Sequence, residues 1–235
     1  MNELKRNARL AGALYLLMGI VSGFGMMYVP SKMFVEGNAA LTVQNITDSA
    51  LLFRFGLAAN LIGQVIFIFL GLSLYNVFKD VDRANARLMM SLVVAAVAVM
   101  FTNIFFEAAV LVVSSRPEYL KGFGTNTRNN LAVLFVAIYK NGVNLLGMFW
   151  GLWLYPFGRL VMKSGFIPKI IGILLMVNCG AYIVDALIFL LVPEWYTTAN
   201  KVLMLPLVAG EFSSILWLLI KGVSNQRTDI PQVAG

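Results

Sequence analysis

The chain has 235 residues, of which 60% are hydrophobic and 12% are charged, and its formal net charge is +7. Soluble domains carry about 25% charged residues, so this composition excludes an ordinary soluble domain and indicates an integral membrane protein. The positive charge does not predict nucleic-acid binding, because the basic residues lie in short stretches between apolar runs, where they act as topology signals.

Histidine is absent and Cys179 is the only cysteine. This composition excludes catalysis by a serine–histidine pair, histidine metal sites and a disulfide within the chain. The sequence also lacks a phosphate-binding glycine loop and the spacing of metal ligands. We therefore predict no metal, no cofactor and no nucleic-acid partner, and we expect membrane lipids around the protein.

Six apolar stretches have the ~20 residues or more that a helix needs to cross the ~30 Å hydrocarbon layer. We predict spans at Ala8–Val29, Leu51–Phe78, Leu88–Val113, Leu131–Tyr155, Pro168–Val192 and Val202–Ile220. The stretches are too long and too uniformly apolar for barrel strands, so helices are favoured. The first stretch is too long for a signal peptide and precedes no cleavage site, so we expect it to be retained.

The fold class is therefore all-α, a six-transmembrane-helix bundle. We expect one transmembrane domain over residues 1–222 and a short polar tail over residues 223–235. Eleven lysines and arginines lie on the side of the two termini and six on the opposite side, so the positive-inside rule places both termini in the cytoplasm. The outer connections are longer, and Pro30–Ala50 is expected to contain a short helix.

Aromatic and small residues add two expectations. Trp153, with its neighbours Trp150 and Tyr155, is expected at the inner membrane interface, where aromatic belts form. Two glycine pairs spaced by four residues predict close helix contacts. The pairs are Gly19 with Gly23 and Gly147 with Gly151.

Four ionisable residues interrupt the apolar stretches: Glu107, Lys140, Asp185 and Glu211. A charge in lipid costs several kcal/mol unless it is paired, protonated or facing a cavity, so such residues mark functional sites by default. All four fall between the predicted outer surface and the midplane. We expect them to converge in one pocket that opens outward, with Lys140 pairing with one or two of the acids.

Neutral polar residues share helical faces with these charges. The face of Glu107 includes Asn103, and that of Lys140 includes Asn144. The predicted binding residues, in addition to the four ionisable ones, are Arg54, Asn60, Gln64, Asn103, Asn144 and Tyr182.

Three functions stay open at this point. The favoured one is binding or transport of a small molecule or ion, with Lys140 holding an anionic group or neutralising the acids. An intramembrane hydrolase would use Lys140 to activate Ser213 or Ser214, because that chemistry needs no histidine. The third is a structural role in which the polar residues only hold helices together, at about 0.6 kcal/mol per hydrogen bond on average.

Several segments together resemble the bacterial membrane family catalogued as domain of unknown function 4386. They are Arg9-Leu-Ala-Gly12 with Tyr15, Gly37-Asn-Ala-Ala-Leu-Thr42 with Asn45-Ile46, Phe53-Arg54, and Ser164-Gly-Phe-Ile-Pro168-Lys-Ile-Ile-Gly172-Ile-Leu-Leu175 followed by Tyr182 and Asp185. The resemblance implies a multi-pass protein of about six spans in the bacterial cytoplasmic (inner) membrane, and it supplies no activity, substrate or cofactor. It carries over Arg54, Tyr182 and Asp185 as recurring positions.

Overall fold

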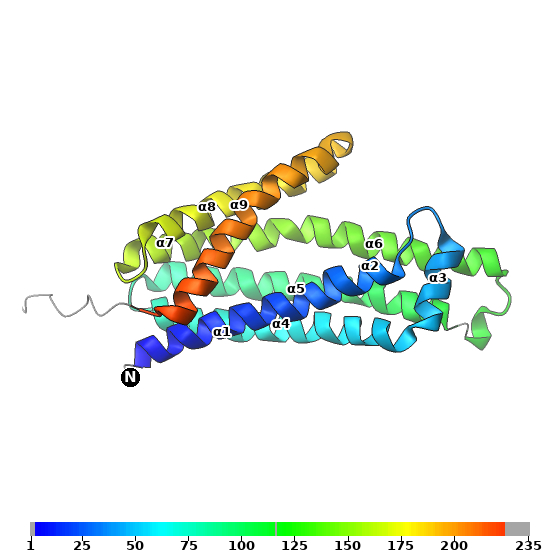
Figure 1. The fold of residues 1–235 in the computed structure, drawn as a ribbon, viewed down its shortest axis with the longest axis horizontal. Coiled ribbons are helices and arrows are strands. Elements are labelled where there is room, and N and C mark those ends of the chain that lie inside the picture. The colour runs from blue at the N-terminus through cyan, green and yellow to red at the C-terminus, as the bar shows by residue number, and fades with distance from the viewer. Residues whose placement is uncertain (1–2, 116, 224–235) are drawn as a thin grey trace, which may run out of the picture. The chain divides into compact units, whose positions relative to one another are not determined.

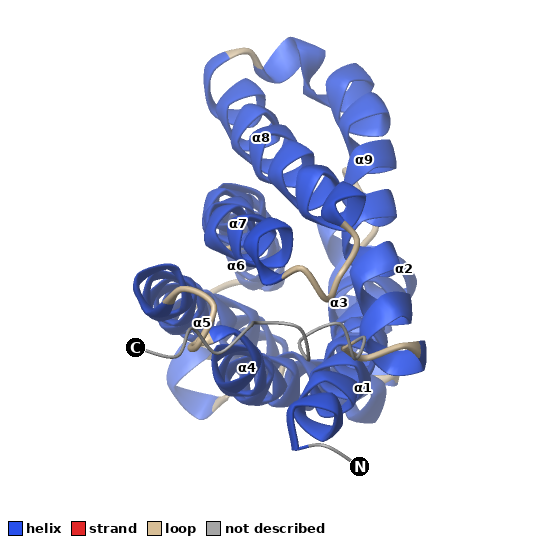
Figure 2. Ribbon diagram, turned by 90° about the vertical axis from the view of Figure 1, so that its left-hand side faces the viewer, coloured by secondary structure: helices blue, strands red, loops and turns tan. Residues whose placement is uncertain are grey.

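The computed structural model describes residues 3–115 and 117–223, and the side chains of residues 204–208 lie outside that description. All regular structure in these ranges is helical, as Figure 2 shows, which confirms the all-α prediction. The predicted tail over residues 223–235 lies outside the described residues from residue 224 onward.

The helices follow one another along the ribbon of Figure 1, which labels the α-helices. They are α1 (Glu3–Gly23), the π-helix η1 (Phe24–Tyr28), α2 (Val29–Met33), α3 (Ala39–Asp48), α4 (Ala50–Phe78), α5 (Arg83–Ser114), the 3-10 helix η2 (Glu118–Leu120), α6 (Thr125–Leu152), α7 (Leu154–Ser164), α8 (Lys169–Leu191) and α9 (Pro193–Ile220). Helix α3 confirms the short helix expected between the first two spans.

Five helical segments of the described chain are long and apolar enough to cross a membrane. They are Glu3–Met33, Ala50–Phe78, Arg83–Ser114, Thr125–Ser164 and Lys169–Leu191. They coincide with the first five predicted spans. The sixth lies in α9, where the described segment Ala209–Ile220 is apolar and the side chains of residues 204–208 lie outside the description, so the count of six and the orientation stay predictions.

The chain packs as two compact units. Unit 1 comprises Met1–Leu16, Phe67–Ala96 and Gly147–Gly235, and unit 2 comprises Leu17–Ile66 and Val97–Leu146. Each unit takes parts of several helices and has buried apolar residues of its own. The single transmembrane domain expected over residues 1–222 stays a prediction.

The core of unit 2 draws apolar side chains from five helices. Its buried members are Val29, Met33, Val43, Ile46, Phe53, Val110, Val113, Ala132 and Val136. Helix α3 contributes Val43 and Ile46 to this core. Asn38 caps its N-terminus, because the Asn38 side-chain oxygen accepts a hydrogen bond from the Leu41 amide at 2.9 Å. Such a cap stabilises a helix by about 1 kcal/mol.

The core of unit 1 contains an aromatic cluster around Trp153. Its indole stacks on Phe157 with ring centroids 5.4 Å apart and meets Phe67 edge-on at 5.3 Å and Tyr15 at 5.9 Å. Each such pair stabilises by about 0.5–1.5 kcal/mol beyond the area it buries. Trp153 is only 2% exposed, so its side chain packs in the core of unit 1, and its position at the inner membrane interface stays a prediction.

The segment between α7 and α8 turns at a glycine and a proline. Gly165 ends α7 with φ of +71°, a left-handed conformation that glycine adopts without strain. Pro168 has φ of −56° and immediately precedes α8, where a missing amide donor costs nothing.

One of the two glycine pairs makes the predicted contact. An added Cβ at Gly151 would lie 2.7 Å from the Tyr182 Cβ, so α6 and α8 approach closely in unit 1. Cβ atoms added at Gly19 and Gly23 would meet nothing within 4 Å. The close contact predicted for Gly19 and Gly23 is therefore wrong for the described chain.

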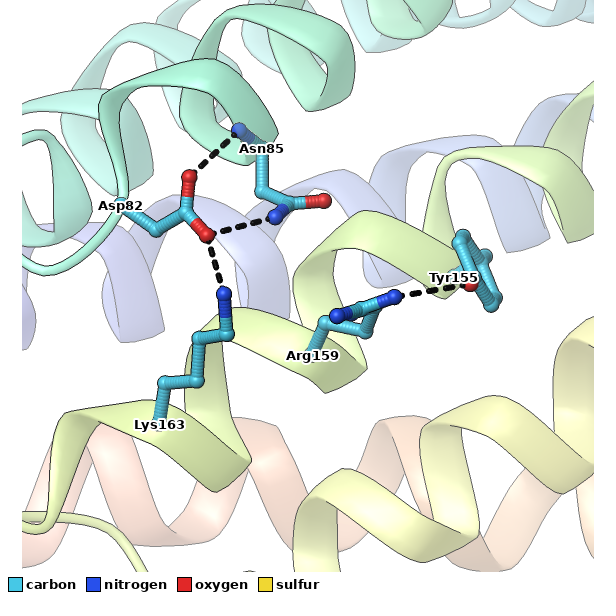
Figure 3. Close-up of polar contacts among 5 residues, drawn as sticks. All are labelled: Asp82, Asn85, Tyr155, Arg159 and Lys163. Carbon is cyan, nitrogen blue, oxygen red and sulfur yellow. Dashed lines mark hydrogen bonds and ion pairs between the residues drawn. The ribbon is translucent and has the colours of Figure 1, made fainter.

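A charged cluster of unit 1 joins the connection between α4 and α5 to α7 (Figure 3). The Lys163 ammonium donates to Asp82 Oδ2 at 2.5 Å, and Asn85 donates its backbone N–H to Asp82 Oδ1 and its side-chain amide to Oδ2. These donors, Lys163 first, hold the pKa of Asp82 well below its usual range. Figure 3 also shows Arg159 donating to the Tyr155 hydroxyl at 3.2 Å.

Candidate functional site

A buried polar cluster in unit 2 joins α4, α5 and α6. The Asn60 amide nitrogen (Nδ2) donates to Glu107 Oε2 at 2.8 Å and to the Tyr139 hydroxyl at 3.1 Å. Glu107 is 0% and Asn60 is 1% exposed, so this carboxylate is wholly enclosed. A buried carboxylate costs several kcal/mol unless it is compensated. The cluster therefore unites two predicted site residues with Tyr139, which the sequence analysis missed.

Asn103 extends the same cluster by one helical turn. Its Nδ2 donates to the backbone carbonyl of Tyr139 at 3.0 Å, which ties α5 to α6. An added Cβ at Gly142 would lie 2.1 Å from Asn103 Oδ1, so the glycine leaves space for this amide. The predicted shared face of Asn103 and Glu107 is thus the face of α5 that is buried in unit 2.

Three buried oxygens of this region accept no hydrogen bond from the described residues. They are Asn60 Oδ1, Gln64 Oε1 and Glu107 Oε1. Gln64 is 4% exposed and lies one turn after Asn60 on the same face of α4. A buried acceptor without a donor costs about 1–3 kcal/mol, and more when it is charged. A donor or positive charge from outside the chain would be stabilised here.

The backbone of η1 shapes this cluster from a fourth side. An added Cβ at Gly25 would lie 2.2 Å from Asn60 Oδ1 and 2.8 Å from the Gly56 carbonyl oxygen. Only glycine therefore lets η1 approach α4 so closely. Gly25 belongs to a π-helix, a rare widening of the helix that is frequent at functional sites.

A cavity of about 240 Å³ lies beside this cluster within unit 2. It is lined by Met26, Pro30, Phe34, Tyr139, Lys140, Val143 and Asn144. The Lys140 ammonium lies 5.3 Å from the centroid of the Phe34 ring, within the range of a cation–π contact. Tyr139 belongs both to the cavity wall and to the Glu107 cluster, so it connects the two.

The pair between Lys140 and Glu107 that the sequence allowed does not form. Ion pairs of the described residues join Lys121 to Glu118 and Lys163 to Asp82. Glu107 is instead bonded to a neutral amide, and Lys140 is exposed beside an aromatic ring. Arg54, another predicted site residue, is exposed on α4.

A second carboxylate is held in unit 1 by two tyrosines. Tyr15 of α1 donates its hydroxyl to Glu211 Oε2 at 2.5 Å, and Tyr182 of α8 donates to Oε1 at 3.0 Å. Both oxygens of Glu211 are therefore satisfied, unlike those of Glu107. Tyr182 was predicted at the site, whereas Tyr15 was not.

Asp185 has a different partner in the same unit. Its Oδ1 accepts a hydrogen bond from Asn200 Nδ2 at 2.9 Å, which links α8 to α9. Asn200 also lies 3.4 Å from the Tyr196 hydroxyl. Asn200 was not predicted as a site residue, although it is a polar residue near the start of the last predicted span.

The two serines of the hydrolase interpretation are bonded to their own helix. Ser213 and Ser214 both donate their hydroxyls to the Gly210 carbonyl oxygen at 2.9 Å. Serines in helices commonly donate their hydroxyl to the carbonyl three or four residues earlier, and such a bond is structural. Nothing in this geometry favours nucleophilic chemistry.

The structure thus brings predicted site residues together within each unit. In unit 2 these are Asn60, Asn103 and Glu107, with Gln64 one turn away and Lys140 and Asn144 in the neighbouring cavity. In unit 1 they are Tyr182 and Glu211. Convergence of all four ionisable residues in one chamber stays a prediction.

Long apolar helices with polar side chains buried among them define a multi-pass helical membrane protein. The chain belongs to the family described as a domain of unknown function (DUF4386), whose model matches residues 10–222. This match confirms the resemblance seen in the sequence. No curated protein and no solved structure matches the chain.

Proposed function

We propose that this protein binds a small anionic molecule in an outward-facing pocket beside Lys140, as a transporter or sensor of that molecule. The supporting observation is the 240 Å³ cavity of unit 2, which Lys140 lines together with Tyr139 and Asn144. No carboxylate of the described residues lies within ion-pair distance of this ammonium. Its three N–H donors are therefore open to a negatively charged ligand.

The size of the cavity limits the ligand. Water occupies about 30 Å³ per molecule in the liquid, so 240 Å³ corresponds to about eight waters. Drug-sized ligands occupy pockets of about 300–1,000 Å³. The cavity suits an anion of a few heavy atoms, such as a short carboxylate or a phosphate, with Phe34 and Val143 supplying an apolar wall.

The proposal includes six spans, both termini in the cytoplasm, and the cytoplasmic (inner) membrane of a bacterium. Helical spans support this membrane, because bacterial outer-membrane proteins are typically barrels. Labelling with a membrane-impermeant maleimide tests the orientation in a Cys179→Ser background. Tyr119→Cys, which is 73% exposed, should react from outside intact cells, whereas the exposed position of Ala84→Cys should react only after lysis. The reverse pattern would contradict the orientation.

Ligand binding is tested by thermal unfolding of the purified protein with acetate or phosphate, compared with chloride at equal ionic strength. A ligand at 100 times its dissociation constant stabilises the folded state by about 2.7 kcal/mol. We expect acetate or phosphate to raise the unfolding temperature of the wild type and to have no such effect on Lys140→Gln.

Lys32→Gln is the matched control. Lys32 is also an exposed lysine of unit 2 that lies over an aromatic ring, 5.9 Å from the centroid of Tyr28, but it does not line the cavity. Its variant should respond to the anions as the wild type does. Equal responses of the Lys140 and Lys32 variants would refute the assignment of the pocket.

A further inference from the structure

The orientation of Asn60 is fixed by the hydrogen bond that its Nδ2 donates to Glu107 Oε2. Its Nδ2 also donates to the Tyr139 hydroxyl, which can donate as well as accept and so does not discriminate between the two orientations. Rotating the amide by 180° would bring its oxygen against the carboxylate and lose the bond to Glu107. Asn60 Oδ1 is therefore an acceptor, and it lies against Gly25 of η1 with no donor of the described chain.

An ionised Glu107 would carry a negative charge that no described residue of unit 2 balances by an ion pair. Its contacts are the neutral Asn60 and, through that amide, the neutral Tyr139. Lys140 follows Tyr139 on α6, but its ammonium lies over Phe34. The buried oxygens without a donor are thus Glu107 Oε1, Asn60 Oδ1 and Gln64 Oε1, all from residues less than 5% exposed.

We propose that Glu107, Asn60 and Gln64 form a binding site for one monovalent metal cation. Carboxylate and amide oxygens are the ligands that hard cations prefer. One positive charge neutralises the single carboxylate, whereas a divalent ion would leave a net charge of +1 buried in the unit. The site goes beyond the anion pocket and rests on separate observations.

A proton compensates this site less completely than a cation. Protonating Glu107 Oε1 would add one donor, which can pair with no more than one of the two amide oxygens. A cation is coordinated by several oxygens at once, so one ion bound where the three oxygens converge would partner all of them. The number of unpartnered acceptors therefore favours a metal cation.

Tyr139 links the cation site to the anion pocket, and this linkage rests on the proposed function. Its hydroxyl accepts from Asn60, while the residue also lines the Lys140 cavity. Ordering Asn60 around a cation orders Tyr139 in the cavity wall. Binding of the cation and of the anion should then be reciprocal, each raising the affinity for the other.

The test measures thermal unfolding and binding of radioactive sodium by the purified full-length protein. Neither acetate nor phosphate is present. Chloride salts of sodium and potassium are compared with choline chloride at one pH and one ionic strength. We expect sodium or potassium to raise the unfolding temperature to a saturating value, and one sodium to bind per chain if sodium is the preferred ion.

Glu107→Gln should lose this response, and Gln64→Met, which keeps the size but removes one ligand oxygen, should weaken binding at least tenfold. The matched control is Glu118→Gln, since that carboxylate is exposed and pairs with Lys121. It should respond as the wild type does.

Stability that depends on pH but not on sodium or potassium would overturn the proposal, because Glu107 would then hold a proton instead. An equal response of the wild type and Glu107→Gln would also overturn it. Because no acetate or phosphate is present, the result is independent of whether Lys140 binds an anion.

Discussion

Replacing Asn60 by leucine should destabilise unit 2 by about 2–4 kcal/mol. The substitution keeps the side-chain volume but removes the donor to Glu107 Oε2 and to the Tyr139 hydroxyl. Both oxygens of an enclosed carboxylate then lack a partner, because Oε1 has none in the described chain already.

The magnitude follows from these losses. Hydrogen bonds within membranes are worth about 0.6 kcal/mol on average and up to about 1.7. A stranded charged acceptor adds about 1–3 kcal/mol or more. Losing the unpartnered Asn60 Oδ1 offsets part of this cost, so the net loss of stability is about 2–4 kcal/mol.

Unfolding in mixed micelles of mild detergent and dodecyl sulfate measures the change. The informative comparison is the double variant Asn60→Leu/Glu107→Leu, since replacing both partners by apolar groups is nearly neutral. It should be more stable than Asn60→Leu alone. The exposed Asn130→Leu is the control, with a change within about 0.5 kcal/mol. Additive losses in the double variant would refute the view that the two side chains form one buried unit.

Three further predictions follow from other contacts, each measured as the change in unfolding free energy or temperature. Gly25→Ala should cost about 1–3 kcal/mol, because the new Cβ would lie 2.2 Å from Asn60 Oδ1; a neutral result would exclude the close approach of η1. Tyr15→Phe removes the hydroxyl that donates to Glu211, and it should lower stability by about 1–2 kcal/mol. An unchanged stability would show that this hydrogen bond contributes nothing.

The third concerns Asp82, whose folded-state pKa is lowered by Lys163. Its stabilisation is present above the unfolded-state pKa of about 3.9 and disappears as the pH falls towards the lower folded-state value. Asp82→Asn should therefore be less stable than the wild type from pH 7 to about pH 5, with the difference shrinking below about pH 4. A difference that grows on acidification would contradict the ion pair.

Much of the fold could be predicted from patterns that are local in sequence. The spans follow from runs of apolar residues, and the turn before α8 follows from Gly165 and Pro168, whose backbone preferences act without tertiary contacts. The face shared by Asn103 and Glu107 follows from helical periodicity alone.

Partners that are distant in sequence could not be predicted. Tyr15 and Glu211 are 196 residues apart, and Asn60 and Tyr139 are 79 apart. Tyrosine is common in membrane helices, and hydropathy does not encode which neutral hydroxyl meets a carboxylate. The opposite charges led to a prediction of ion pairs. In the structure, neutral amides and hydroxyls donate hydrogen bonds to the acidic side chains instead.

Trp153 and Gly19 show the same limit for packing. By composition alone, a tryptophan near the end of an apolar stretch fits a membrane interface and a protein core equally well. In the structure, Phe67 and Phe157 pack against Trp153, so its side chain is part of the core. Glycine spacing permits a close contact, but a second helix must be present at that depth, and none contacts Gly19 among the described residues.

The proposed function requires that a small anion enters the pocket at Lys140 from the outer side. Val143→Cys in a Cys179→Ser background keeps Lys140 and places a thiol in the cavity wall. A membrane-impermeant thiosulfonate added outside intact cells should modify it, and acetate or phosphate should slow that reaction in a saturable way unless Lys140 is changed to glutamine. Modification only from the cytoplasmic side, or modification from outside that neither anion slows, would contradict the account.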